Sequence, residues 1–280
     1  MNNTKPKLPE TTLSSLEKRL KQVVTKSLIT QGVLPESRLA PKSKQILAES
    51  YVANAKTYDL KTEFLSSRAK NALYGIYESH VKALNEISTK LDSANKDYKE
   101  ITSKSSVYRS LKQDEMYNLN AVKLHELFFA NISDLASEIT MDSMAFLRLQ
   151  RDWGDFDAWQ RDFVACALSA RDGWVVMGFD SYIGKYINFF IDGHDNHVSV
   201  GCLPVLVVDV HHHAYYKDYM EDKLSYIFAM MKEIRWPAVE ARISIIERSG
   251  ISAVLGTSPP GAIPAQPVVA PTVNNEIGTV

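Results

Sequence analysis

A carboxylate and an imidazole stand four positions apart, directly after an apolar run. The run, 203–208, is rich in β-branched residues and predicts a buried strand. Asp209 ends it, and His213 follows four residues later. If a helix begins after Asp209, both side chains can point at one ion, and iron, manganese and zinc all accept Asp and His as ligands. The stretch therefore predicts part of a metal site.

His211 and His212 precede His213, so the three imidazoles could also form an independent zinc or nickel site. Consecutive residues rarely converge on one ion, and we favour the pairing of Asp209 with His213. The further ligands needed to complete such a site have to come from other elements of the chain.

The bulk composition is that of an ordinary globular protein. The chain has 280 residues, of which 45% are hydrophobic, and its net charge is −1. This balance argues against a dedicated nucleic-acid binder. The N-terminus lacks the apolar core of a signal peptide, and no run of 18 apolar residues exists, so we expect neither secretion nor a membrane span. Cys166 and Cys202 are expected to be buried free thiols.

Two long helices are predicted in the first half of the chain, at 66–92 and 116–139, because apolar residues recur every three or four positions. The polar segment 93–115 between them is expected to be a loop, so the helices form an antiparallel hairpin. Shorter helical patterns precede them, at 12–31 and at 46–55.

The second half begins with a helix from Asp155 to about Ala170. Three runs rich in β-branched and aromatic residues then predict a three-stranded antiparallel sheet, and two helices follow, at 218–233 and 237–248. The fold class is therefore α+β. We divide the chain into an N-terminal helical extension (1–58), a helical hairpin (59–140), an α/β half (141–249) and a Pro-rich tail (250–280).

Three stretches of the chain carry patterns of one known family. Residues 209–216, DVHHHAYY, are similar to D-x-W-E-H-A-Y-Y. Residues 153–174 are similar to an F-G-S-F-D-x-F…G-S-G-W segment, and residues 125–131 to an H-x-x-x-F-W-x-N helix. With these patterns the chain resembles iron/manganese superoxide dismutases. The resemblance spans about 60–248 and implies a helical hairpin followed by an α/β half.

In that family three His and one Asp hold iron or manganese, which cycles between two oxidation states to dismutate superoxide. The resemblance implies that His125, Asp209 and His213 stand at three of the four ligand positions. The first His position falls on Ala72 or Leu73, neither of which can bind a metal. His80, at the position of the family's gate Tyr, could replace this ligand only if its helix shifted, because it lies about 11 Å along the axis.

Three further positions bear on activity. His211 replaces the family's pocket-wall Trp, and His212 replaces the Glu that crosses the dimer interface, which puts the usual dimer in doubt. His194 falls where the family has a Gln or His that hydrogen-bonds the metal-bound solvent. The resemblance thus implies either no cofactor, or iron, manganese or zinc at a partial site.

We expect a non-catalytic structural or assembly protein on a superoxide dismutase-like fold, a component of a large particle such as a phage virion. Its partners would be other protein subunits, contacted through residues 1–50 and 250–280, and a homo-oligomer stays open. An active dismutase with His80 as a rearranged ligand is the alternative, and a mitochondrial ribosomal subunit is a lesser one. We expect the chain in a virion or the cytoplasm rather than in mitochondria.

Overall fold

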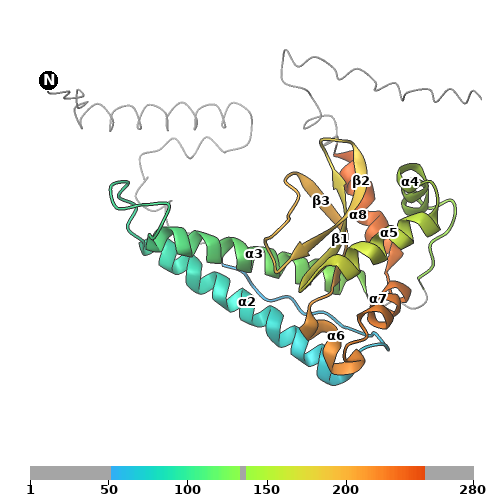
Figure 1. Cartoon of the computed structure of the whole chain (residues 1–280), viewed down its shortest axis with the longest axis horizontal. Coiled ribbons are helices and arrows are strands. Elements are labelled where there is room, and N and C mark those ends of the chain that lie inside the picture. Colours follow the sequence, from blue (N-terminus) through green and yellow to red (C-terminus); the bar gives the residue numbers. More distant parts are fainter. Residues whose placement is uncertain (1–51, 133–136, 250–280) are drawn as a thin grey trace, which may run out of the picture. The chain divides into compact units, whose positions relative to one another are not determined.

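The computed structural model describes residues 52–132 and 137–249, and all that follows concerns these residues (Figure 1). They form seven helices and three strands, in the α+β order that the sequence predicts. The elements are α2 (Ser67–Ser93), α3 (Val107–Asn131), α4 (Met144–Trp153), α5 (Phe156–Ser169), β1 (Gly173–Asp180), β2 (Lys185–Asp192), β3 (Cys202–Asp209), α6 (His212–Tyr219), α7 (Lys223–Lys232) and α8 (Trp236–Arg248).

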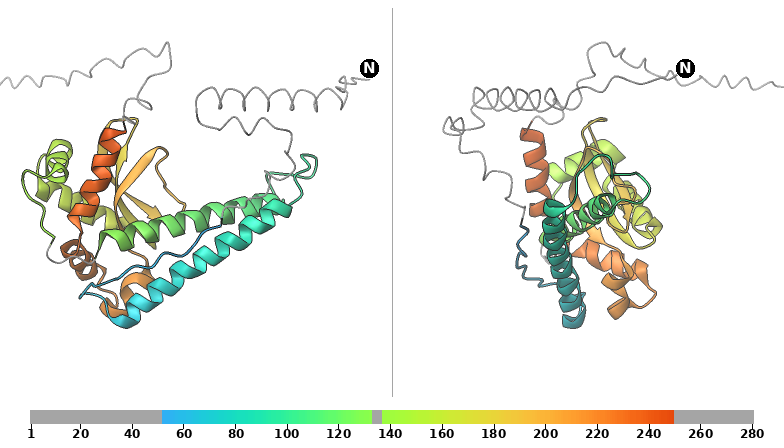
Figure 2. Two further views of the ribbon diagram at one scale, coloured as in Figure 1. Left: turned by 180° about the vertical axis from the view of Figure 1, so that it is seen from behind. Right: turned by 90° about the vertical axis from the view of Figure 1, so that its left-hand side faces the viewer.

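Helices α2 and α3 form the predicted antiparallel hairpin, side by side in every view (Figures 1 and 2). Each begins at a serine, Ser66 or Ser106, whose hydroxyl accepts a backbone N–H three residues later. The buried face of α2 recurs with helical spacing through Ala69, Leu73 and Tyr77 to Leu91. The hairpin therefore presents one apolar side to the rest of the domain.

The sheet has strand order β2-β1-β3, with both pairings antiparallel. The central strand β1 is buried along almost its whole length, with α5 packed on β1 and β2 and with α3 and α8 packed on β3. Gly173 begins β1 because the backbone carbonyl of Ile191 would lie 1.8 Å from any Cβ there. In this register Trp174 pairs with Ile191 on one side and with Asp209 on the other, which fixes the position of the Asp209 carboxylate.

At both outer strands, backbone groups form hydrogen bonds with side chains from the helices. The amide of Asn131 donates to the carbonyl of Val207 at 2.9 Å and accepts from the N–H of Val207 at 3.2 Å. Arg242 donates to the carbonyl of Val205 at 2.8 Å and to Asn131 Oδ1 at 3.0 Å. On β2, the N–H of Tyr186 donates to Asp152 at 2.8 Å. These bonds tie α3, α8 and α4 to the sheet.

The structure corrects several predicted boundaries. Helix α3 begins at Val107 and ends at Asn131 instead of covering 116–139, and α4 was not predicted. The helix predicted at 218–233 begins only at Lys223, as α7, because the preceding helix α6 ends at Tyr219 and Met220 adopts a φ of 51°. The helical pattern at 46–55 does not extend over its described part, since 52–55 are not helical. Both cysteines are free but only half-buried.

The predicted helix at 12–31 and the Pro-rich tail lie outside the described residues. The four domain boundaries therefore stay predictions. Within the described ranges, no helix is long and apolar enough to cross a membrane.

Candidate metal centre

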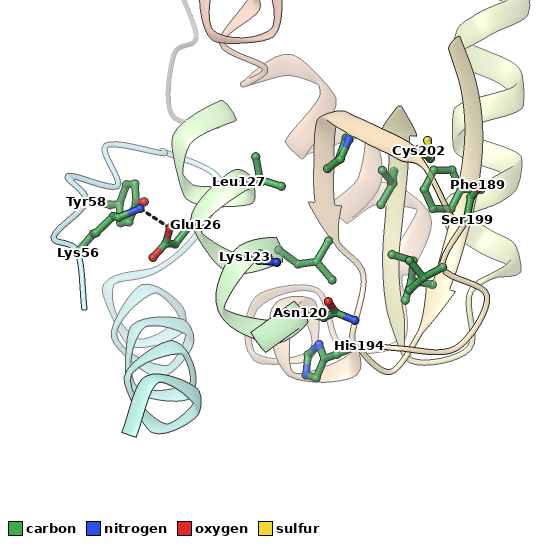
Figure 3. Close-up of a pocket in the computed structure, with 15 residues that line it drawn as sticks. Lys56, Tyr58, Asn120, Lys123, Glu126, Leu127, Phe189, His194, Ser199 and Cys202 are labelled. Carbon is green, nitrogen blue, oxygen red and sulfur yellow. Dashed lines mark hydrogen bonds and ion pairs between the residues drawn. The ribbon is translucent and has the colours of Figure 1, made fainter. Parts of the chain in front are cut away.

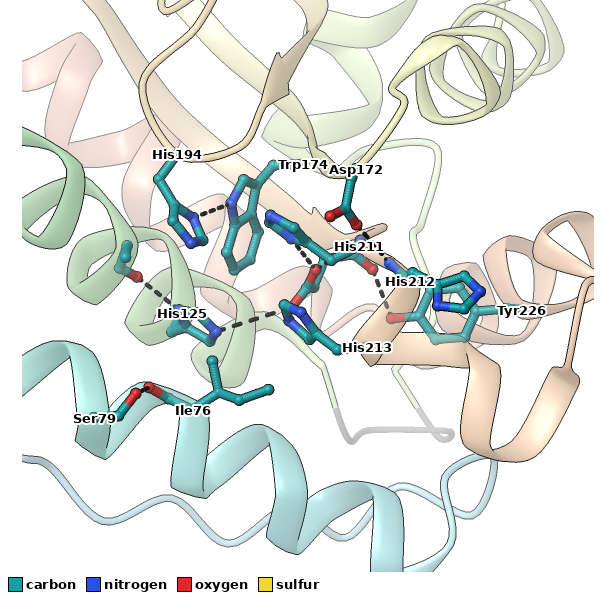
Figure 4. Close-up of polar contacts among 12 residues, drawn as sticks. Ile76, Ser79, His125, Asp172, Trp174, His194, His211, His212, His213 and Tyr226 are labelled. Atoms are coloured by element: carbon teal, nitrogen blue, oxygen red, sulfur yellow. Dashed lines mark hydrogen bonds and ion pairs between the residues drawn. The ribbon is translucent and has the colours of Figure 1, made fainter.

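Three elements bring the predicted ligands together (Figure 4). His125 comes from the C-terminal half of α3, Asp209 from the last position of β3, and His213 from the first turn of α6. One ligand atom of each lies within 4.8 Å of the other two. The side chains of His125 and Asp209 are fully buried, and that of His213 is 26% exposed. Two imidazoles and a carboxylate thus meet where the helical hairpin adjoins the sheet.

The orientation of His125 is fixed by its own helix. Its Nδ1 lies 2.7 Å from the carbonyl of Ala121, one turn earlier, and a carbonyl can only accept, so Nδ1 carries the hydrogen. Burial lowers the pKa of His125 to about 4, even though Asp209 acts in the opposite direction. The ring is therefore neutral near pH 7, and its Nε2 presents a lone pair.

That lone pair has no hydrogen-bond partner although Nε2 is buried. It faces Asp209 Oδ2 at 3.9 Å, so two acceptors confront each other in the interior. Such an arrangement is costly unless a cation or a hydrogen-bond donor lies between the two atoms. Ligand atoms about 2.1 Å from a shared ion can stand at most about 4.2 Å apart, which accommodates this pair. The residues present fit a metal ion.

Asp209 is held as a carboxylate. Burial acts to raise its pKa, but the charges of His211 and His213 and their hydrogen bonds outweigh this effect, so the pKa lies well below its ordinary value. His211 Nδ1 lies 2.7 Å from Oδ1, and His213 Nε2 lies 3.3 Å from Oδ2. The hydroxyl of Tyr226 donates to the main-chain carbonyl of Asp209 at 2.7 Å and fixes the backbone at this point.

His213 responds to the same carboxylate. Burial acts to lower its pKa, but the charge of Asp209 and the hydrogen bond to it outweigh burial and raise the pKa. Its ring stacks on that of His211, with centroids 4.7 Å apart. A metal bound between Asp209 and His213 would replace the hydrogen that His213 Nε2 shares with Oδ2.

His80 and His194 line this centre without joining the group of ligand atoms that lie close together. His80 Nδ1 lies 2.9 Å from Asn118 Oδ1, and its ring centroid lies 5.8 Å from that of His125. His194 Nδ1 accepts from the indole N–H of Trp174 at 2.9 Å, and the Trp174 ring packs edge-on against His125 at 4.8 Å. Among the described residues His80 is thus beside the centre and not a fourth ligand.

The first ligand position carries no donor on α2. Leu73 is fully buried in the hydrophobic core, whereas Ala72 is half-buried. Ala72, Ile76 and His80 recur every four residues and share one face of α2. In Figure 4 the side chain of Ile76 points from α2 toward His125 and His213. At the Ala72 and Ile76 positions, this face of the helix therefore adjoins the centre with hydrocarbon and not with an imidazole.

From the sequence we expected His211 to replace the Trp of the pocket wall. Its hydrogen bond to Asp209 was not predicted. The backbone N–H of His211 also donates to Asp209 Oδ1, at 3.0 Å, which is the turn that an Asp forms with the residue two positions on. The signal was the Asp-x-His spacing at the end of a strand. His212 points elsewhere: its side chain is exposed and lies against Tyr216, and its N–H donates to Asp172.

Comparison with known proteins agrees with this geometry. The family model for the C-terminal domain of iron/manganese superoxide dismutases matches residues 143–242. The iron superoxide dismutase of Aquifex aeolicus (strain VF5) is 32% identical over 167 residues, which cover 59% of this chain and 78% of the relative. That of Cupriavidus metallidurans is 28% identical over 190 residues, covering 66% and 92%. The resemblance is thereby confirmed, and the chain belongs to the iron/manganese superoxide dismutase family.

Proposed function

We propose that this chain binds one iron or manganese ion between His125, Asp209 and His213, and that the ion is a structural link rather than a catalyst of superoxide dismutation. The observation that carries the proposal is the buried, unpartnered Nε2 of His125, which faces Asp209 Oδ2 at 3.9 Å. When bound, the ion supplies positive charge to the carboxylate and accepts the lone pairs of both imidazoles.

The position of the ligands supports a structural role. His125 belongs to the helical hairpin, whereas Asp209 and His213 belong to the strand and helix of the second half. An ion shared by all three joins elements that are distant in the sequence, and such a link stabilises the folded state.

We infer the loss of catalysis from the residues around His125, Asp209 and His213. Redox cycling in this family relies on four protein ligands, and α2 presents Ala72 or Leu73 where the first His belongs. His80 is engaged with Asn118 instead. The pocket-wall Trp is replaced by His211, which binds Asp209 itself.

Superoxide dismutation is the second candidate. Relatives at 28–32% identity are named as iron or manganese superoxide dismutases. His194 also lies beside His125, with ring centroids 6.0 Å apart, and its Trp174 hydrogen bond holds the ring in place. A metal with three protein ligands keeps coordination positions that a small anion could use.

Metal analysis of the purified full-length chain, combined with a superoxide assay, separates these candidates. We expect about one iron or manganese per chain, no dismutation beyond that of the free ion, and a lower unfolding temperature after chelation. Asp209→Asn should abolish metal binding, whereas Asp157→Asn, in the first turn of α5, should not. Metal-dependent dismutation that Asp209→Asn abolishes would establish the second candidate, and a metal-free, stable chain would refute the structural link.

We also propose that residues 1–50 and 250–280 contact other protein subunits in a large particle such as a phage virion. This proposal rests on the family resemblance ending near 60 and 248 and on the composition of the two segments. Deleting either segment should leave the central domain folded and abolish incorporation into the particle. Unfolding of the isolated domain after deletion would contradict it.

A further inference from the structure

A cavity of about 490 Å³ lies between α3 and the sheet, apart from the three metal-ligand candidates (Figure 3). Its walls come from α3, from all three strands and from the loop between β2 and β3. The volume falls within the range typical of small-molecule sites. None of His125, Asp209 and His213 lines it, whereas His194 does.

The body of the cavity is hydrocarbon. Leu124 and Leu127 line it from α3, and apolar side chains line it from the sheet: Val176, Phe189, Ile191 and Pro204. Val176 and Phe189 pair across the β1–β2 register, so they present a continuous apolar surface. An occupant must therefore bring an apolar portion.

The polar groups of the lining include several hydrogen-bond donors. Lys123 is exposed and has no ion pair with any described carboxylate, whereas Glu126 is already paired with Lys56. His194 Nδ1 accepts from Trp174, so its hydrogen is on Nε2. Asn120 adds an amide, and Figure 3 shows it beside His194. Donors with one unpaired positive charge match an anionic head group.

We propose that this cavity binds a medium-chain monocarboxylate, with its hydrocarbon chain against the sheet and its carboxylate toward Lys123, Asn120 and His194. No covalent step is involved. Because His194 lines the cavity and is also hydrogen-bonded to Trp174 beside His125, an occupant reaches the wall of the metal centre.

Binding of three probes to the full-length chain tests the proposal by titration calorimetry. Octanoate should bind with one site per chain. 1-Octanol has the same chain without the charge, and acetate has the charge without the chain, so both should bind at least about tenfold more weakly. Equal binding of octanoate and 1-octanol, or no saturable octanoate binding, would overturn the proposal.

Two variants and a control locate the site. Lys123→Glu should weaken octanoate binding at least about tenfold, because it replaces attraction by repulsion. Lys99→Glu, an exposed change outside the lining, should leave it unchanged. Val198→Trp places a large ring at a half-exposed lining position and should also block binding while the unfolding temperature is retained. An unchanged affinity in Lys123→Glu would refute the assigned head-group position.

A spectroscopic readout tests the contact with His194. Octanoate should shift the indole N–H resonance of Trp174, identified by its loss in Trp174→Phe, because this N–H donates to His194. The indole N–H of Trp153, which donates to Asp162, should not move. A shift of Trp153 alone would place octanoate elsewhere and contradict the proposal.

Discussion

His211 donates two hydrogen bonds to one oxygen of Asp209, from its ring at 2.7 Å and from its backbone at 3.0 Å. Oδ1 of Asp209 is therefore fully engaged, and only Oδ2 faces His125 and His213. A metal at this centre would have Asp209 as a one-oxygen ligand whose orientation is set by the residue two positions on.

Replacing His211 should cost stability. We expect His211→Phe to lower the free energy of unfolding by about 1–3 kcal/mol, because a buried bond to a charged group is lost while the backbone bond stays. Urea denaturation of metal-stripped protein measures the change. His212→Phe, at the neighbouring exposed position, should stay within about 0.5 kcal/mol of the wild type. Equal effects of the two substitutions would show that the ring of His211 does not hold Asp209.

Restoring an imidazole on α2 should strengthen metal binding. Ala72 is half-buried on the helix face that adjoins the centre, so Ala72→His can add a fourth ligand with little loss of packing. We expect retention of iron or manganese against a competing chelator to improve at least about tenfold. Asn71→His, on an exposed position one residue away, is the control. No gain in Ala72→His would mean that α2 lies too far from the triad.

The stability of metal-stripped protein should fall as the pH drops below about 6.5. Burial, with smaller contributions from His211 and His80, lowers the pKa of His194 to about 3. In the unfolded chain His194 therefore takes up a proton near its ordinary pKa of about 6.5. In the folded chain it stays neutral until the pH approaches 3. The contribution of neutral His194 is complete above that pH and is lost as the pH falls toward 3.

His194→Gln should make this pH dependence shallower by about one proton, or about 1.4 kcal/mol per pH unit between pH 6 and 4.5. Urea denaturation at several pH values measures the slope. His125, with its pKa lowered to about 4 by burial, gives a similar slope that remains in the variant. A slope unaltered by His194→Gln would contradict the neutral state of this ring.

Arg242 should be a strong contributor to stability. Its guanidinium donates to Asn131 Oδ1 and to the carbonyls of Val205 and Leu127, so Arg242→Ala leaves three acceptors without this partner. We expect a loss of about 2–4 kcal/mol in thermal or urea unfolding. Arg242→Lys should recover only part of it, because an ammonium cannot reproduce the planar fork. Arg248→Ala, exposed at the end of the same helix, should have little effect.

Much of the fold followed from periodicity, and the errors have local causes. The strands and the buried stripe of α2 carry strong apolar patterns, and both were predicted. The first turns of α3 were taken for a loop, because apart from its later turns the helix is mostly exposed. Helix α4 buries only Ala145 and Leu149, too few residues to form a recognisable stripe. The interruption at Met220 has a positive φ without the glycine that usually announces one.

The sequence predicts those residues of the candidate centre that lie within short motifs of the family. Asp209 and His213 lie in one short motif, and His125 lies in another. The roles of the replaced residues were not accessible, because they depend on which side chains meet across elements. His80 forms a hydrogen bond with Asn118, and His194 forms one with Trp174. Neither partner can be predicted from the spacing of these residues in the sequence.

The hydrogen bonds from Asn131 and Arg242 to β3, and from Tyr186 of β2 to Asp152, have a consequence for self-association. Backbone groups at both margins of the sheet are already engaged by side chains of the same chain. A strand from a neighbouring copy therefore cannot pair at these groups without first breaking these bonds. At these positions of the described sheet, the side chains of Asn131, Arg242 and Asp152 therefore protect the edges against edge-to-edge aggregation.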